Sequence, residues 1–266
     1  MSGAASRPAL RLGGRRVLLA YGLLGEVAAS LHRFGVDYMN SLQAWLATQG
    51  ADAAVVRLPT AAPVAANATR LAAALLADPR PAIIIAHSKG GLEALDALMA
   101  REAQARCTGF VALQSPFYGS PVADGIIAAR PLAAAAGVLA RVLRVGSDKG
   151  LRDLTTEARQ AWMESHGSSI AALMRRVPTV CVATELTGPV RGRERFHLAA
   201  SRWLLKQGTG PNDGLVPVRS ALLPGARHLI ARGSHLACVS QGPTRDPLAL
   251  VARALALLEE PVQPSR

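Results

Sequence analysis

The chain is poor in aromatic residues and has no long hydrophobic run. Phe, Trp and Tyr make up 4% of its 266 residues, so Ala, Leu and Val must fill most of any core. The longest nearly uncharged apolar stretch, Pro131 to Ala140, is far shorter than the roughly 20 residues that a membrane-spanning helix needs. Half of the residues are hydrophobic and 18% are charged, which excludes an intrinsically disordered chain and allows a sizeable core.

Lysine is scarce although the chain is strongly basic. Only three of the 30 basic residues are lysine, and the formal net charge is +12. Such a charge can attract nucleic acid or other anionic surfaces. The arginines are scattered, however, and no basic run is interleaved with aromatic residues as single-strand binding requires. We therefore interpret the charge as a feature of composition and expect no specific nucleic-acid partner.

Cysteine is also rare. Cys107, Cys181 and Cys238 are odd in number and lack metal-ligand spacing, which favours a reducing compartment. Arg15-Arg16 and the apolar residues after it are similar to a twin-arginine leader, but Glu26 interrupts the apolar run. We interpret this stretch as a first core strand, and we expect a cytoplasmic location.

Strand-like and helix-like segments alternate along the chain, which predicts an α/β fold with a mostly parallel central sheet and helices on both faces. Strands are predicted at 16–21, 53–58, 82–86, 109–114, 177–183 and 227–231. Helices are predicted at 38–48, 66–77, 90–105, 131–143, 155–166 and 248–259.

The segment from about 122 to 176 breaks this alternation. It is rich in Ala and Leu and reads as helical, so we interpret it as a helical cap inserted over the carboxyl edge of the sheet. No repeat or low-complexity linker divides the chain. We therefore predict a single domain over 1–266 that contains the cap, and the apolar stretch 131–143 could line an acyl pocket or be a plain core helix.

The most informative motif surrounds Ser88. A buried strand at 82–86 runs into Ala86-His-Ser88-Lys-Gly90 and then into a helix. A sharp strand-to-helix turn needs small residues two positions before and after the serine, and it exposes the hydroxyl near a helix N-terminus. This context predicts that Ser88 is a nucleophile, although a helix-capping serine has the same local sequence.

A serine nucleophile needs a general base, and six histidines compete for that role. His235 lies in a loop after the last predicted strand, where its side chain can lean over the sheet edge, and it fits the chain order Ser, acid, His. We expect His87, beside the serine, to be packed or hydrogen-bonded locally. The remaining histidines are His32, His166, His197 and His228.

The base needs a carboxylate to orient it, and Asp213 is the strongest candidate. It lies in the Gly- and Pro-rich loop 208–217, after the predicted strand 177–183. The same Asn-Asp-Gly sequence also suits a plain tight turn. Glu185, just past the end of that strand, is the rival acid.

Acyl transfer also requires donors for an oxyanion, usually backbone N–H groups. One donor should come from Lys89, the residue after the serine. The second should come from the loop Gly22 to Gly25, where Leu23 is the first choice and Leu24 the alternative.

Five motifs in order make the chain similar to bacterial triacylglycerol lipases of the α/β-hydrolase fold, over about residues 17–239. The resemblance implies a Ser88, Asp213 and His235 triad and an oxyanion hole at Leu23 and Lys89. It also implies a cleft bordered by the loop 116–121, with Tyr21, Leu24 and Phe117 at the substrate. The motifs are Tyr21-Gly-Leu-Leu-Gly25, Ala86-His-Ser-Lys-Gly90, Ser115-Pro-Phe-Tyr-Gly-Ser-Pro-Val-Ala-Asp124, Asn212-Asp-Gly-Leu-Val-Pro217 and Ser234-His-Leu236.

The chain departs from that family at three points. Tyr21 stands where the family has a histidine whose side chain supports the oxyanion loop, whereas the backbone donor of that loop does not depend on this residue. Ala237 stands where secreted members have a calcium-binding aspartate, and no cysteine pair brackets the cap. We therefore expect no metal and no cofactor, and an intracellular esterase-like relative.

The resulting prediction is a serine hydrolase that cleaves a small-molecule acyl ester or a lipid, with peripheral contact to lipid surfaces left open. An acyltransferase or a thioesterase would use the same triad, and a non-catalytic binding protein could share the fold. Acyl chain length, head group, lid motion and oligomeric state are not set by these residues.

Overall fold

The structure is a computed structural model, and it describes most of the chain. The described residues are 10, 12–20, 40–59, 61–135, 148–190, 192–242 and 245–260. Tyr21, Leu23 and Leu24, which the sequence places near the substrate, lie outside these ranges.

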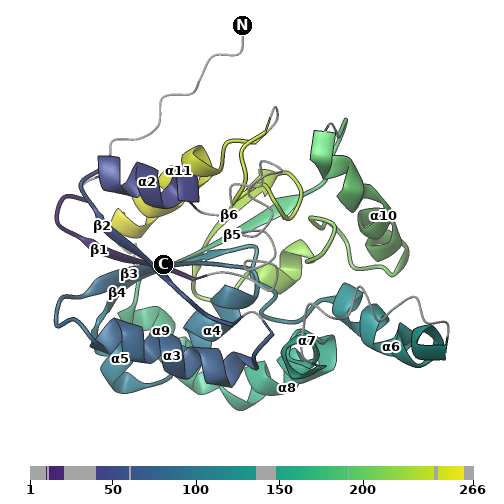
Figure 1. The fold of residues 1–266 in the computed structure, drawn as a ribbon, viewed down its shortest axis with the longest axis horizontal. Coiled ribbons are helices and arrows are strands. Elements are labelled where there is room, and N and C mark those ends of the chain that lie inside the picture. Colours follow the sequence, from purple (N-terminus) through teal and green to yellow (C-terminus); the bar gives the residue numbers. More distant parts are fainter. Residues whose placement is uncertain are drawn as a thin grey trace, which may run out of the picture.

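The centre of the molecule is a six-stranded parallel sheet in the order β2-β1-β3-β4-β5-β6 (Figure 1). The chain starts inside the sheet at β1, adds β2 on one side and then builds the remaining strands on the other, so all carboxyl ends meet at one edge. Ligand sites of open α/β sheets lie at this edge. The strands are β1 (Arg16–Ala20), β2 (Asp52–Val56), β3 (Ala82–His87), β4 (Cys107–Leu113), β5 (Thr179–Glu185) and β6 (Arg227–Arg232).

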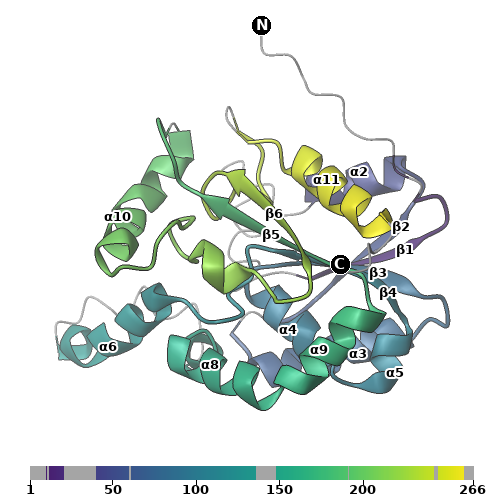
Figure 2. The same ribbon diagram turned by 180° about the vertical axis from the view of Figure 1, so that it is seen from behind.

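Helices cover both faces of the sheet (Figures 1 and 2). One face carries α2 (Asn40–Thr48) and α11 (Pro247–Glu259), and the opposite face carries α3 (Val64–Leu76), α4 (Lys89–Ala97) and α5 (Arg101–Ala105). The other elements are α6 (Pro121–Ala135), α7 (Asp148–Arg152), α8 (Thr156–Ser165), α9 (Gly167–Arg176), α10 (Leu198–Lys206), η3 (Gly192–His197) and η4 (Val218–Ala221).

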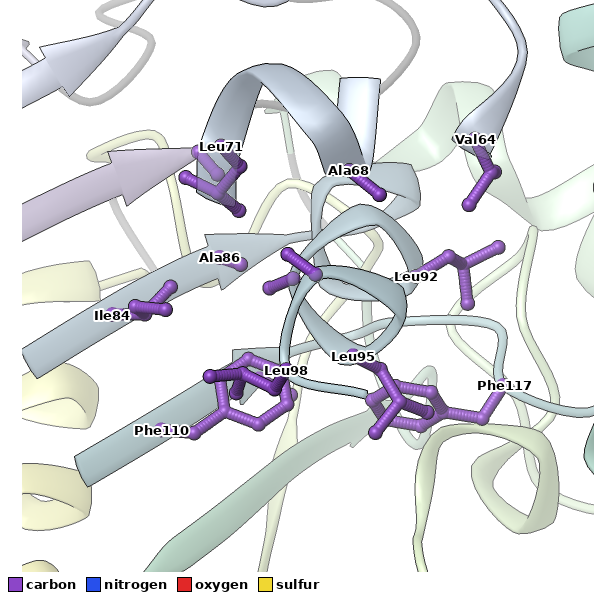
Figure 3. Close-up of a cluster of buried hydrophobic side chains, with 14 of the residues drawn as sticks. Val64, Ala68, Leu71, Ile84, Ala86, Leu92, Leu95, Leu98, Phe110 and Phe117 are labelled. Carbon is purple, nitrogen blue, oxygen red and sulfur yellow. The ribbon is translucent and has the colours of Figure 1, made fainter. Parts of the chain in front are cut away.

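The strands are apolar on both faces, and alternate residues feed two cores. In β3, Ile83 and Ile85 join the core under α2 and α11, whereas Ile84 and Ala86 join the core under α3 and α4. This alternation follows from the two-residue repeat of a strand. Figure 3 shows Leu92 and Leu95 of α4 within the second core, which fixes the helix that follows Ser88 against the sheet.

The fold agrees closely with the sequence prediction. Every predicted strand is present with each end within two residues of its predicted position. The predicted helix 90–105 is two helices, because the chain leaves the helical conformation at Ala100 between α4 and α5. No helix in the described ranges has the length and apolar character needed to cross a membrane.

Within its described residues, the predicted cap segment contains the helices α6 to α9. Ile170 and Leu173 of α9 and Met163 of α8 are buried in the core that also holds α3 and α4, so these two helices pack onto a face of the sheet. By contrast, α6 extends away from the sheet in both views (Figures 1 and 2). We propose that only the α6–α7 part of the segment forms the predicted cap over the carboxyl edge of the sheet. Residues 136–147, which include most of the predicted 131–143 helix, lie outside the described residues.

Candidate active site

Ser88 occupies the turn between β3 and α4. Its backbone has φ 55° and ψ −126°, a region that L residues rarely adopt and that costs about 1–3 kcal/mol. The Ser88 N–H donates to the Leu113 carbonyl at the end of β4 (2.9 Å), and this bond ties the turn to the neighbouring strand. The strained strand-to-helix turn predicted from the sequence is therefore present.

Space around the turn is as limited as predicted. Ala86 and Gly90, the small residues on either side of Ser88, are both buried. The closest approach is at Gly91, where a Cβ atom would overlap the side chain of Ser115.

His235 lies between Ser88 and Asp213. The Ser88 hydroxyl is 3.0 Å from Nε2 of His235, and Nδ1 of His235 is 2.8 Å from Oδ2 of Asp213. Because a carboxylate only accepts, Nδ1 carries the proton and Nε2 accepts from the hydroxyl. His235 and Asp213 are 5% and 1% exposed, so the chain of hydrogen bonds is buried at these two residues and ends at the half-buried Ser88 oxygen.

The loop that holds Asp213 is built by hydrogen bonds to its own backbone. Oδ1 of Asp213 accepts from the N–H groups of Leu215 (2.8 Å) and Val216 (2.7 Å), which leaves Oδ2 for the imidazole. Gly214 has φ 93°, which only glycine adopts without strain. The Asn-Asp-Gly turn is thus present and, at the same time, aims the carboxylate.

The histidine loop is fixed to the acid loop and to β5. The His235 N–H donates to the Asp213 carbonyl (2.9 Å), and the Gly233 N–H donates to the carbonyl of Glu185 (2.9 Å). Glu185, the rival acid, therefore contacts this loop through its backbone, whereas the imidazole pairs with Asp213. Of the two candidates, the geometry favours Asp213.

No protein-family model matches the chain, and a search of curated proteins finds no match. Several solved structures are similar. The carboxyl esterase MGS0156, from a metagenome, superposes with a TM-score of 0.72 at 20% identity, over 97% of this chain and 80% of that one. Lipase BlEst2 of Bacillus licheniformis, in its mature form, gives 0.64 at 22% identity, over 88% and 89%. Lipase 1 of Pelosinus fermentans gives 0.63 at 13% identity, over 94% and 100%.

The chain has the α/β-hydrolase fold. The predicted fold class is therefore confirmed. The turn at Ser88 lies at the carboxyl edge of the sheet, where the loops that hold Asp213 and His235 also meet.

Of the predicted oxyanion donors, only Lys89 lies within the described residues. Lys89 is the first residue of α4, where backbone N–H groups have no acceptor within the helix, so its N–H is suited to bind an anion beside Ser88. Leu23 and Leu24, the candidates for the second donor, lie outside the described residues, and so does Tyr21.

The side chain of Lys89 forms a buried ion pair that the sequence prediction missed. Its Nζ contacts Glu93 one helical turn away and donates to the Ala62 carbonyl (2.8 Å), with both charged side chains at most 1% exposed. Asn67 of α3 donates to the same Glu93 oxygen (2.6 Å). Burial raises the pKa of Glu93, an effect that the Lys89 charge opposes. The i, i+4 spacing of the two residues was the available signal.

Phe117 requires a correction. The resemblance to lipases places it at the substrate, but its side chain is fully buried in the core under α4. Figure 3 shows its ring beside Leu95. Burial of a large aromatic side chain contributes a favourable free energy because much apolar surface is removed from water. In this chain, which has few aromatic residues, Phe117 contributes that free energy to the core.

A groove of about 970 Å³ lies between α6 and α8. Both charged and apolar side chains line it, among them Asp124, Glu157, Ile127 and Ala161. No group of three His, Cys, Asp or Glu side chains in the described ranges is arranged to hold a metal ion.

His87 is packed locally, as predicted, and its neighbour is His235. Its ring centroid is 4.9 Å from that of His235, and its Nε2 is 3.2 Å from the His235 carbonyl. Burial, with a smaller contribution from the neighbouring His235, holds the pKa of His87 well below 6.5. His87 therefore stays neutral beside His235.

We expect His87 to make the fold sensitive to acid. As the pH falls below 6.5, the unfolded chain binds a proton at His87 and the folded chain does not, so the free energy of unfolding decreases by up to about 1.4 kcal/mol per pH unit. His87→Gln should remove this part of the slope. Urea unfolding of both proteins from pH 7.5 to pH 5 measures it, and equal slopes would show that His87 does not contribute.

Proposed function

We propose that the chain is a serine ester hydrolase of the carboxylesterase or lipase type. The observation that supports this most is the alignment of Ser88, His235 and Asp213, at 3.0 and 2.8 Å, on a strained turn at the ligand-binding edge of the sheet. The similar solved structures are those of two lipases and a carboxyl esterase, which supports this proposal.

The proposed reaction proceeds through an acyl-enzyme. The Ser88 oxygen attacks the acyl carbonyl carbon while its proton passes to Nε2 of His235, and Asp213 stabilises the imidazolium that forms. The imidazolium then gives its proton to the departing alcohol oxygen as the ester bond breaks. Water attacks the acyl-enzyme, loses a proton to His235, and the acid is released as the Ser88 hydroxyl is restored.

The carbonyl oxygen acquires negative charge in each addition step. We propose that the Lys89 N–H is one donor to it and that the Leu23 N–H, or that of Leu24, is the other. Because each such donor contributes about 2.7–4 kcal/mol to transition-state stabilisation, the pair accounts for a large part of the rate.

The proposal is tested with p-nitrophenyl esters that carry short to long acyl chains. We expect hydrolysis with a preference for one chain length, and an inactive wild-type protein across the whole series would contradict the proposal. Parallel reactions with an acyl thioester, and with an ester plus an added alcohol, measure whether thioester cleavage or acyl transfer exceeds ester hydrolysis. Either excess would assign the same triad to a thioesterase or an acyltransferase instead.

A further inference from the structure

Gln114 lies directly behind the acid–base pair in an unusual backbone conformation. It follows the last residue of β4, it is completely buried, and its φ is 52°, in the left-handed region that few residues other than glycine adopt. Its backbone N–H donates to the carbonyl of Val182 in β5 (2.7 Å). The strained backbone is thus tied to the neighbouring strand, and it holds the side chain beneath the two loops.

The Gln114 amide contacts three separate segments. Its Nε2 lies 2.8 Å from the Ser234 carbonyl and 3.3 Å from Oδ2 of Asp213, and it also contacts the hydroxyl oxygen of Thr184. These groups belong to the histidine loop, the acid loop and β5. Since a carbonyl and a carboxylate only accept hydrogen bonds, the amide must present its NH₂ group to them, and a flipped amide would face them with its oxygen.

Two of these contacts bear directly on the catalytic geometry. Oδ2 of Asp213 is the same oxygen that accepts the Nδ1–H of His235, and the Ser234 carbonyl belongs to the residue before His235. One NH₂ group therefore restrains both partners of the hydrogen bond that orients the base. The Thr184 hydroxyl reaches the same Ser234 carbonyl at 3.3 Å and supports the arrangement.

We propose that Gln114 is a positioning residue that sets the acid–base pair of the triad. The inference rests on the proposed function, since it assigns Asp213 and His235 their catalytic roles. Gln114 does not touch the reacting atoms. It acts through Asp213 and the histidine loop, because a buried carboxylate and a buried carbonyl that lose their donor must rotate or admit water.

The first test is Gln114→Met, which keeps the length of the side chain and removes its polar atoms. We expect kcat for a p-nitrophenyl ester to fall about 10- to 100-fold with KM unchanged within about twofold, because an unpaired buried acceptor misaligns the base without altering the substrate contacts. Gln104→Met is the matched control. Gln104 lies on α5, away from the triad, and the same change there should leave kcat unchanged.

The pH profile separates positioning from a general loss of structure. Without the amide donor, the negative charge of Asp213 is less neutralised and stabilises the His235 imidazolium more strongly. The acidic limb of kcat/KM should therefore move to higher pH. Gln114→Leu, which also lacks a donor and adds no charge, should move that limb in the same direction and lower kcat similarly. The other titratable groups around the pair are His87, Glu194, His197, Cys238 and Arg245. Because the Gln114 side chain is also hydrogen-bonded to His87, His87→Gln is measured in parallel to separate the contribution of His87 to the acidic limb.

Wild-type activity separates the two claims. An inactive wild type contradicts the proposed function. If the wild type is active and the Gln114→Met variant folds, a variant with the same kcat and the same acidic limb as the wild type overturns the role of Gln114. Rates are expressed per folded molecule from near-UV circular dichroism. If Gln114→Met does not fold, Gln114→Leu carries the test, and a folded variant with wild-type kcat and an unmoved acidic limb overturns the inference equally.

Discussion

Ser88→Ala is expected to lower kcat for ester hydrolysis by about 10⁶-fold, to the rate that the rest of the site can support. The Ser88 oxygen is the only serine oxygen to which His235 Nε2 is hydrogen-bonded among the described residues, at 3.0 Å, and alanine removes it without adding bulk to the cramped turn. Alanine keeps the Cβ atom and the same strained backbone conformation, so the free energy of unfolding should change little. Ester assays and urea unfolding on the same preparations measure both quantities.

The acid is tested alongside the nucleophile. Asp213→Asn should lower kcat by about 10⁴-fold, because an amide in place of Oδ2 favours the wrong imidazole tautomer. Glu185→Gln is its matched control, since the Glu185 side chain is not the partner of His235 and only its carbonyl supports the histidine loop. Loss of activity in Glu185→Gln with retained activity in Asp213→Asn would reverse the assignment of the acid.

The second large effect is expected on stability, at the buried Lys89–Glu93 pair. Lys89→Met should lower the free energy of unfolding by about 3–5 kcal/mol, because it leaves the Glu93 carboxylate buried without its cation. The double variant Lys89→Met with Glu93→Gln should lose much less, since glutamine keeps an acceptor for Asn67 and no charge remains in the core.

Urea unfolding of the wild type, both single variants and the double variant gives the coupling between the two side chains. Arg80→Met is the control for a surface pair. Arg80 contacts Asp78 and Asp52 at exposed positions, so its replacement should change stability little. If the losses in the free energy of unfolding from Lys89→Met and Glu93→Gln were additive, the two side chains would act independently. The ion pair would then not contribute to the stability of the fold.

The sheet and the turn at Ser88 could be predicted because their signals are local. Continuous apolar runs such as Ala82 to Ala86 mark buried strands, and the small residues around Ser88 mark the turn. That Asp213 and His235 lie near Ser88 was predicted from chain order, since loops at the carboxyl edge of a parallel sheet lie close together. For Asp213 the predicted tight turn is present, and the backbone N–H groups that form it also orient the carboxylate toward His235, so the turn is compatible with the proposed catalytic role.

Other features could not be predicted because they depend on which strands are neighbours. Gln114 reaches Asp213 and Ser234 only because β4 pairs with β5, and its sequence context gives no sign of its positive φ. Motif position places Phe117 at the substrate, but whether its ring faces the cleft or the core is decided by the packing of α4. Periodicity alone does not show which surface a helix covers, so the burial of Ile170 and Leu173 of α9 in the core could not be predicted.

Reaction of the wild-type protein with a fluorophosphonate probe, followed by mass spectrometry of its peptides, tests the central claim most directly. The account predicts one covalent adduct, on Ser88, which is absent from Ser88→Ala and forms much more slowly in His235→Ala. A wild-type protein that forms no adduct, or an adduct on another serine that persists in Ser88→Ala, would contradict it.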